Sequence, residues 1–252
     1  MQKCSLFLYQ IGSGKAPPEW FLKQTQTVHI QRLYYIKGGK GYACGENGQK
    51  TDFEAGKLYL FPYNYPQRFV TDRDDPIDHV YFDFLSVPPL IGDRPIVLDA
   101  ACDKALVYAL RSAEEFARDF SDETKPRNFG AASGSDKTAD DSEYKQIAYS
   151  LTYTILLLLS RNEPLPFVRD ELILRAVEYM EENLSSEVCI RDLAAEIGFE
   201  ENYFIRRFKK AMGMTPYAFL RSRRLYEARE RIADGMPLTH VSETVGYENA
   251  SS

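Results

Sequence analysis

One pattern occurs twice in the last part of this 252-residue sequence. The first copy, CIRDLAAEIGFEENYF, runs from Cys189 to Phe204, and the second, PLTHVSETVGYENASS, runs from Pro237 to Ser252. In both copies, apolar residues at positions i, i+3 and i+7 precede a glycine, which predicts a short helix that packs through one face and then turns tightly. Such a pattern is typical of helix-turn-helix units.

The two copies correspond position by position. The equivalent pairs, 48 residues apart, are Ile190 and Leu238, Leu193 and Val241, Ile197 and Val245, Gly198 and Gly246, Phe199 and Tyr247, and Glu200 and Glu248. The first copy continues into a full second helix, whereas the sequence stops at the opening of the corresponding helix in the second copy. We expect this stub, from Asn249 to Ser252, to fray, because a single turn without an apolar pair cannot bury a face.

The second helix of the first copy has two unlike faces. Phe204 and Phe208, four residues apart, predict the buried face. Asn202, Ile205, Arg206 and Lys209 recur at i, i+3, i+4 and i+7 on the opposite face. Asn pairs with adenine, Arg pairs with guanine and Ile contacts a thymine methyl group, while Lys209 and Lys210 suit phosphates. Two alternatives to base contacts remain open: Arg206 is only a surface charge, or Ile205 is half-buried rather than exposed to a base.

Charge is distributed unevenly along the chain. The net charge of −6 argues against a general nucleic-acid binder. Between Asn202 and Arg231, however, nine Lys or Arg side chains accompany only Glu227 and Glu230, a local charge of +7. A local patch of this kind indicates nucleic-acid binding more directly than the whole-chain sum. A solvated helix face is the alternative.

The fold class predicted from the rest of the chain is α+β. Residues 1–98 contain short, aromatic-rich segments such as TVHIQRLYYI and DHVYFDFLSV, typical of a small antiparallel β-barrel or sandwich. Residues 99–165 predict a helical hairpin that caps the barrel or pairs two subunits, with a mobile loop at 121–141. Residues 166–252 predict an all-α domain, with helices at about 169–183, 190–197, 201–211, 215–233 and 238–245.

One strand of the predicted barrel offers a polar, aromatic face. Alternation places His79, Tyr81 and Asp83 on one side of it, a set suited to hydrogen bonding and stacking on a sugar-like ligand. Alternatively, this polar face is the solvent-exposed face of a strand at the edge of the sheet. The three histidines form no HxH pair, and we find no nucleophile–base motif or phosphate loop. We therefore expect a binding protein without a metal or other cofactor rather than an enzyme.

Cysteine usage and hydropathy indicate a cytoplasmic protein. Cys4, Cys44, Cys102 and Cys189 are scattered without ligand spacing, as free thiols are in a reducing compartment. The longest apolar run, at 155–159, is far too short to cross a bilayer. No leader with a charged, an apolar and a small-residue region opens the chain, so we do not expect secretion.

The segment LAAEIGFEENYFIRRFKKAMGMTPYAFLRSRRLYEAR resembles the first reader and linker helix of the AraC/XylS family of bacterial transcription regulators. FKK, GMTP and the Arg224, Leu225, Ala228 set fall at the family's positions, and the resemblance covers about 168–252. LYYIKGGKGY and GKLYLFPYNYPQRF resemble, less closely, the family's cupin-like effector domain. Glu200 departs from the small hydroxyl residue that the family usually has at the start of its recognition helix.

This resemblance implies a cytoplasmic homodimer whose partners are promoter DNA, a small-molecule effector and RNA polymerase. It implies that Asn202, Ile205 and Arg206 face bases. It also places the effector at His79 and Tyr81, with Lys37, Arg68 and Phe69 as further candidates. We therefore expect a regulator that responds to a sugar-like effector. A ligand-binding or dimerisation module with weakened DNA binding, and a metal-dependent cupin enzyme, are the alternatives.

Overall fold

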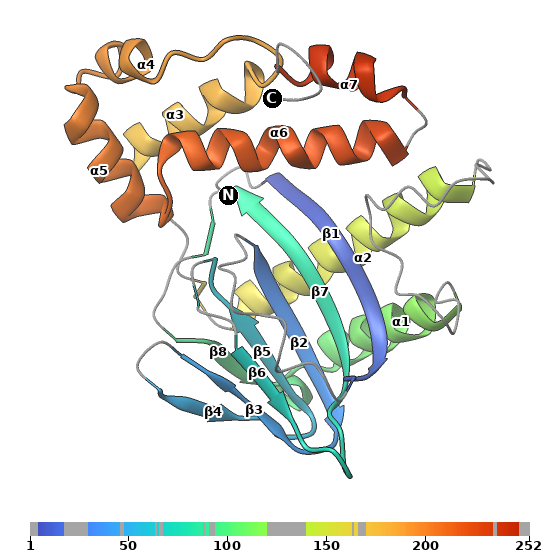
Figure 1. Cartoon of the computed structure of the whole chain (residues 1–252). Coiled ribbons are helices and arrows are strands. Elements are labelled where there is room, and N and C mark those ends of the chain that lie inside the picture. Colours follow the sequence, from blue (N-terminus) through green and yellow to red (C-terminus); the bar gives the residue numbers. More distant parts are fainter. Residues whose placement is uncertain are drawn as a thin grey trace. The chain divides into compact units, whose positions relative to one another are not determined.

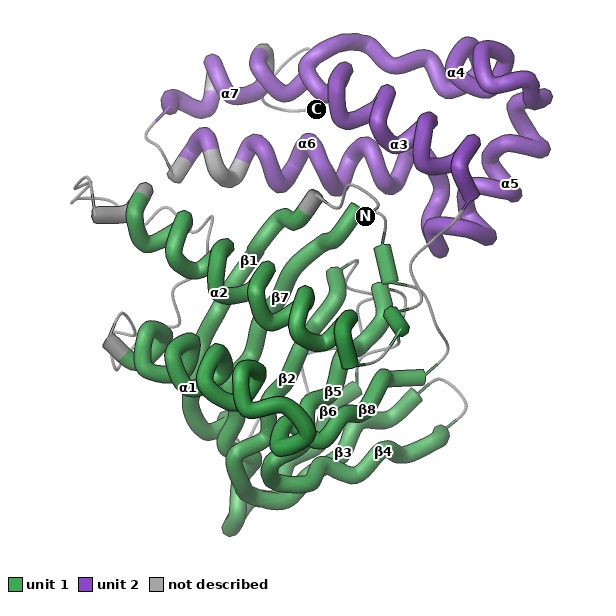
Figure 2. The backbone as a smooth tube through the Cα atoms, turned by 180° about the vertical axis from the view of Figure 1, so that it is seen from behind, with its two compact units in different colours: residues 1–128, 138–166 green, residues 129–137, 167–252 purple. Residues whose placement is uncertain are grey.

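The computed structural model describes residues 5–17, 30–45, 48–63, 65, 68–87, 89–90, 94–119, 140–162, 164–165, 170–233 and 236–246. Most of the predicted loop at 121–141, and the predicted stub from Asn249 to Ser252, lie outside these residues. The chain divides into two compact units (Figure 2). The first consists of residues 1–128 and 138–166, and the second of residues 129–137 and 167–252.

Eight strands form the sheets of the first unit. They are β1 (Ser5–Lys15), β2 (Gln31–Gly38), β3 (Gly41–Cys44), β4 (Lys50–Asp52), β5 (Lys57–Phe61), β6 (Arg68–Thr71), β7 (Asp78–Val87) and β8 (Ile96–Asp99). One sheet has the order β1-β7-β2-β5-β8 and the other has the order β4-β3-β6. All recorded pairings are antiparallel, as the aromatic-rich segments separated by turn residues predict.

Of the β-barrel and the sandwich predicted for residues 1–98, the barrel is wrong. Among the described residues, the strands form two separate antiparallel sheets, and neither closes on itself. Aromatic and aliphatic side chains from both sheets, including Tyr34, Phe61 and Phe69, fill the space between them. Burying these large rings joins the sheets through packing rather than through a continuous hydrogen-bond ladder.

Two helices cover the other face of the larger sheet (Figure 1). They are α1 (Lys104–Asp119) and α2 (Asp140–Asn162), and a 3-10 turn at Ala100–Cys102 precedes α1. Leu106, Leu110 and Ala113 supply the apolar stripe of α1, and each is at most 1% exposed. Asp103, just before α1, binds Arg161 and the side-chain amide of Asn162 at the end of α2. These polar contacts join the helices at one end.

The second unit contains helices only. They are α3 (Glu171–Glu182), α4 (Ile190–Glu196), α5 (Glu201–Met212), α6 (Pro216–Ala233) and α7 (Leu238–Thr244). All five helices predicted from the sequence are confirmed, with ends that differ by one or two residues. Thr215 accepts a hydrogen bond from the Ala218 amide, and Pro216 occupies the first position of α6, where no amide hydrogen is needed.

Helix α6 is the long connector of this unit. Its 18 residues span about 27 Å at 1.5 Å per residue. Helices α4 and α5 lie at its N-terminal end and α7 at its C-terminal end (Figures 1 and 2). Arg223, only 1% exposed, donates from Nε to Glu181 of α3 at 2.6 Å, so a buried ion pair fixes the connector to α3. None of the described helices is long and apolar enough to span a bilayer.

Candidate nucleic-acid interface and effector face

Glu200 caps the N-terminus of α5. One carboxylate oxygen accepts the backbone amide of Tyr203 at 3.0 Å, and the other accepts the side-chain amide of Asn202 at 3.1 Å. The backbone amides of Asn202 and Tyr203 lower the pKa of Glu200, because they bind the charged carboxylate. A longer acidic residue thus performs the capping role that a small hydroxyl residue has elsewhere.

The two faces of α5 differ as the sequence predicts. Phe204 and Phe208 are fully buried, and the Phe208 ring lies 5.9 Å from that of Phe219 in α6. Asn202, Arg206 and Lys209 are exposed, and so is Lys210. Ile205 is half-buried, the intermediate state that the sequence left open. The helix therefore presents a polar, basic outer face whose position is set by its buried rings.

Nearly half of the basic patch is occupied by internal contacts. Arg207, Arg223, Arg224 and Arg231 bind, respectively, Asp170, Glu181, the carbonyl groups of Leu184 and Ser186, and Glu227. Arg206, Lys209, Lys210 and Arg221 are exposed and form no ion pair with any described residue. The local charge of +7 therefore overstates the positive charge available to a partner.

Arg207 connects α5 to the start of α3. Its guanidinium donates to both carboxylate oxygens of Asp170, at 2.8 and 3.2 Å, and stacks over the Phe199 ring at 4.9 Å. The Arg207 hydrogen bond and the cap at the start of α3 lower the pKa of Asp170. Sequence reasoning missed this pair, because residues 37 apart in the chain give no periodic signal.

The turn of the second copy is closely packed. Gly246 has a φ of +81°, like Gly198 of the first copy at +83°. A Cβ at Gly246 would lie 2.7 Å from the Leu184 carbonyl oxygen and 2.8 Å from the Arg224 guanidinium. Arg224 itself donates to the carbonyl groups of Leu184 and Ser186, so it links α6 to the segment between α3 and α4.

In the first unit, His79, Tyr81 and Phe69 come together on the face between the sheets. The Tyr34 ring lies 5.0 Å from that of His79 and 5.1 Å from that of Phe69, and the His79 and Tyr81 rings are 5.3 Å apart. Because β7 lies between β1 and β2, the alternative of an exposed edge strand is wrong. Burial lowers the pKa of His79 to about 4 and raises that of Tyr81 to about 12.

Buried polar groups continue along this face. Arg32 donates to Asp83 at 2.9 Å, and both side chains are about one-tenth exposed. Burial raises the pKa of Asp83 against the opposite effect of Arg32. Gln10 donates to the Tyr81 hydroxyl at 2.9 Å. Arg32 is not among the residues predicted from the sequence, although one cation in an apolar strand and one acid in the neighbouring strand are a detectable signal.

Two of the candidate effector residues lie elsewhere. Lys37 forms ion pairs with Asp78 at 2.8 Å and with Glu114 of α1 at 3.0 Å, so its ammonium group faces the helical layer. Arg68, the first residue of β6, is exposed. The structure therefore groups only three of the five candidates: His79, Tyr81 and Phe69. No cluster of His, Cys, Asp or Glu suited to a metal occurs among the described residues.

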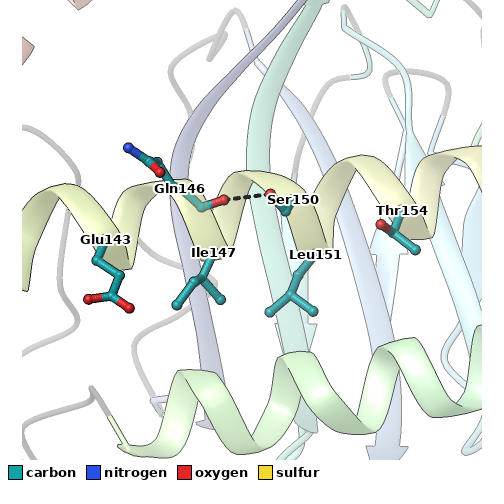
Figure 3. A pocket seen from close by; sticks show the side chains of 6 residues that line it. All are labelled: Glu143, Gln146, Ile147, Ser150, Leu151 and Thr154. Carbon is teal, nitrogen blue, oxygen red and sulfur yellow. Dashed lines mark hydrogen bonds between the residues drawn. The ribbon is translucent and has the colours of Figure 1, made fainter.

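A shallow hollow follows the outer side of α2. Its lining residues, all from that helix, are Glu143, Gln146, Ile147, Ser150, Leu151 and Thr154 (Figure 3). Ile147 and Leu151 extend toward α1 in this view. Ile147 is 39% exposed, and Leu157, ten residues further along the helix, is 41% exposed. Helix α2 thus carries apolar side chains that the described part of the first unit leaves half open.

Comparisons with known proteins agree on one class of protein, transcriptional regulators. A family model described as a helix-turn-helix domain matches residues 193–252. The raffinose operon transcriptional regulatory protein RafR of Pediococcus pentosaceus is 22% identical over 244 residues, 95% of this chain and 84% of that protein. The probable transcriptional regulator LumQ of Photobacterium leiognathi is 29% identical over 118 residues, 45% and 46% of the respective chains.

The fold also has a counterpart of known structure. Wild-type ToxT of Vibrio cholerae, solved with an unsaturated fatty acid bound, has a TM-score of 0.50 at 11% identity, over 100% of this chain and 89% of that one. The family match and the curated relatives favour a regulator over an enzyme and over a module that has lost its DNA function. Together with the FKK and GMTP motifs, they make the C-terminal part of the chain, residues 193–252, similar to the helix-turn-helix domain of AraC-type transcription regulators.

Proposed function

We propose that α5 reads promoter DNA in the major groove through Asn202, Ile205 and Arg206, while Lys209 and Lys210 bind phosphates. The observation that carries this proposal is the exposed basic face of α5 opposite the fully buried Phe204 and Phe208. Side chains at i, i+3 and i+4 reach successive base edges when the N-terminal part of a helix enters the groove.

Selection of binding sites from random duplex DNA by the full chain tests this role. We expect Arg206→Ala to weaken binding about 5- to 150-fold and to relax the preference at one base position. Lys209→Ala should weaken all sequences equally and reduce the slope of log affinity against log salt by about 1. Arg175→Ala removes an exposed arginine of α3 as a control. Equal weakening of every sequence by Arg206→Ala would exclude a base-reading role.

For the effector, we propose a small hydroxyl-rich ligand at the face of His79 and Tyr81. Asp83 balances the charge of Arg32, and burial keeps His79 neutral near pH 7, so the polar groups there suit an uncharged ligand. RafR, by its name, regulates a raffinose operon, which supports a sugar. ToxT has been solved with an unsaturated fatty acid, which makes a fatty acid the competing class.

Thermal unfolding of the full chain with neutral oligosaccharides and with unsaturated fatty acids separates the two classes. A ligand at 100 times its Kd stabilises the folded state by about 2.7 kcal/mol, which is readily detected. We expect sugars to raise the melting temperature and His79→Gln to abolish the rise. Tyr108→Phe, at a position 65% exposed on α1, serves as the control. A rise with fatty acids alone would replace the sugar assignment.

We also propose that two copies of the chain pair over the outer side of α2. The half-exposed Ile147 and Leu157 would be buried in such a contact. Light scattering should give a dimer for the native chain and a monomer for Ile147→Lys. Tyr108→Lys, which places the same charge on α1, should remain dimeric. A native chain that is monomeric at about 10 µM, where a dimer with a Kd of about 1 µM would predominate, would contradict the proposal.

A further inference from the structure

Glu200 occupies one of the hydrogen-bonding groups of the Asn202 side chain. The side-chain amide of Asn202 has two N–H donors and one carbonyl acceptor. One donor is directed to Glu200 at 3.1 Å, which also fixes which side of the amide carries nitrogen. One donor and one acceptor therefore remain for a partner outside the protein.

The remaining pair of groups matches one base better than the others. In the major groove, adenine presents an acceptor at N7 and a donor at N6, whereas guanine presents two acceptors, N7 and O6. An amide with one outward donor and one outward acceptor can satisfy adenine completely. It cannot satisfy both acceptors of guanine, because its second N–H is already bound.

We propose that Glu200 is a positioning residue that makes Asn202 select adenine over guanine. This inference rests on the base-reading role proposed above for Asn202. The carboxylate is suited to the task because its second oxygen is held by the Tyr203 backbone amide at 3.0 Å, which anchors the side chain. The lowered pKa of Glu200 keeps the carboxylate ionised at neutral pH, so it accepts both hydrogen bonds.

The small hydroxyl residue usual in the family at this position has a different effect. A serine reaches the backbone amides of its own helix, but its single short hydroxyl does not replace both carboxylate oxygens. Asn202 would then regain its second donor and its freedom to rotate by 180°. Glu200→Ser therefore keeps the helix cap while it releases Asn202, which separates the structural role from the positioning role.

The test compares four full-length proteins: native, Glu200→Ser, Asn202→Ala and the double variant. Selected binding sites identify the base position whose preference Asn202→Ala abolishes, and competition with duplexes that carry A or G there measures the ratio of affinities. We expect the native chain to prefer adenine by about 5- to 150-fold at this position. Glu200→Ser should reduce that ratio at least about fivefold, mainly by tighter binding of guanine sites. It should leave the other positions unchanged.

Each other outcome has a definite meaning. If Asn202→Ala relaxes the base preference and Glu200→Ser does not, the positioning role fails and the reading role of Asn202 stands. If Asn202→Ala changes no preference, both fail. If Glu200→Ser acts equally in the Asn202→Ala background, Glu200 acts on the DNA directly and the inference is overturned. Unchanged melting temperatures of the four proteins would confirm that a lost cap is not the cause.

Discussion

The described parts of the two copies of the repeat have similar backbones and different packing contacts. Both first helices, α4 and α7, begin without a side-chain cap, and both end at a glycine with a φ near +80°. In the first copy, Ile190 is 1% exposed and the turn glycine is open to solvent. In the second copy, Leu238 is 59% exposed and the turn glycine lies against Leu184 and Arg224.

This difference indicates how one sequence pattern can be stabilised in two ways. The first copy buries Ile190 and Leu193 of its apolar stripe and the phenylalanine pair of α5, whose Phe208 packs on Phe219 of α6. The second copy, as far as it is described, buries Val241 and Val245 but not Leu238, and its turn packs against an arginine of α6 and a carbonyl group after α3. The described parts of both copies therefore share a left-handed turn glycine and buried stripe residues, while only the second copy leaves its first stripe position exposed and packs its turn closely.

The largest expected difference is at the first equivalent pair. Ile190→Ala should lower the free energy of unfolding by about 2–5 kcal/mol, since it leaves a cavity in a fully packed site. Leu238→Ala, at the equivalent but exposed position, should change it by no more than about 0.5 kcal/mol. Denaturant unfolding of the two variants, followed by circular dichroism at 222 nm, gives both values. Similar losses would show that Leu238 is buried as Ile190 is.

Alanine in place of the turn glycine should destabilise the second copy more than the first. Ala at either position adopts a left-handed conformation at a cost of about 1–2 kcal/mol. Gly246→Ala must also displace the Leu184 carbonyl group or Arg224, so we expect a total loss of about 2–4 kcal/mol. Gly198→Ala meets no neighbouring atom within 4 Å and serves as the matched control. Equal melting temperatures for the two variants would contradict the close packing of the second turn.

A smaller effect is expected from Arg224, the residue that supports the second turn. Arg224→Lys retains the charge, but a lysine cannot donate to the carbonyl groups of Leu184 and Ser186 from two nitrogens of one planar group. We therefore expect the free energy of unfolding to fall by about 1–2 kcal/mol. Arg221→Lys, one turn earlier and exposed, should be neutral. Thermal unfolding of both variants measures the difference. If Arg224→Lys is neutral, the second turn does not depend on the guanidinium group.

Much of the second unit could be predicted from the sequence, because its helices have strong apolar periodicity and clear glycine breaks. The buried faces of Phe204 and Phe208 followed from spacing alone. The partners of Arg207, Arg223 and Arg224 did not, since they lie 37 to 42 residues away in the chain. The predicted barrel failed for a similar reason: strand propensity identifies strands, but which strands pair is set by long-range contacts.

The smallest expected effect concerns the pH dependence of the α5 cap. The pKa of Glu200 is lowered in the folded state, so its contribution to stability is present above the unfolded value and is lost as the pH falls through the folded value. We expect the native chain to lose stability relative to Glu200→Ser between about pH 5 and pH 3, because serine caps the helix without titrating. Unfolding of both proteins across this range measures the difference, and Glu196→Gln, which removes an exposed acid of α4, is the control. A pH-independent difference would mean that the carboxylate of Glu200 does not stabilise the start of α5, whose position would then depend on the buried Phe204 and Phe208 and on the ion pair between Arg207 and Asp170.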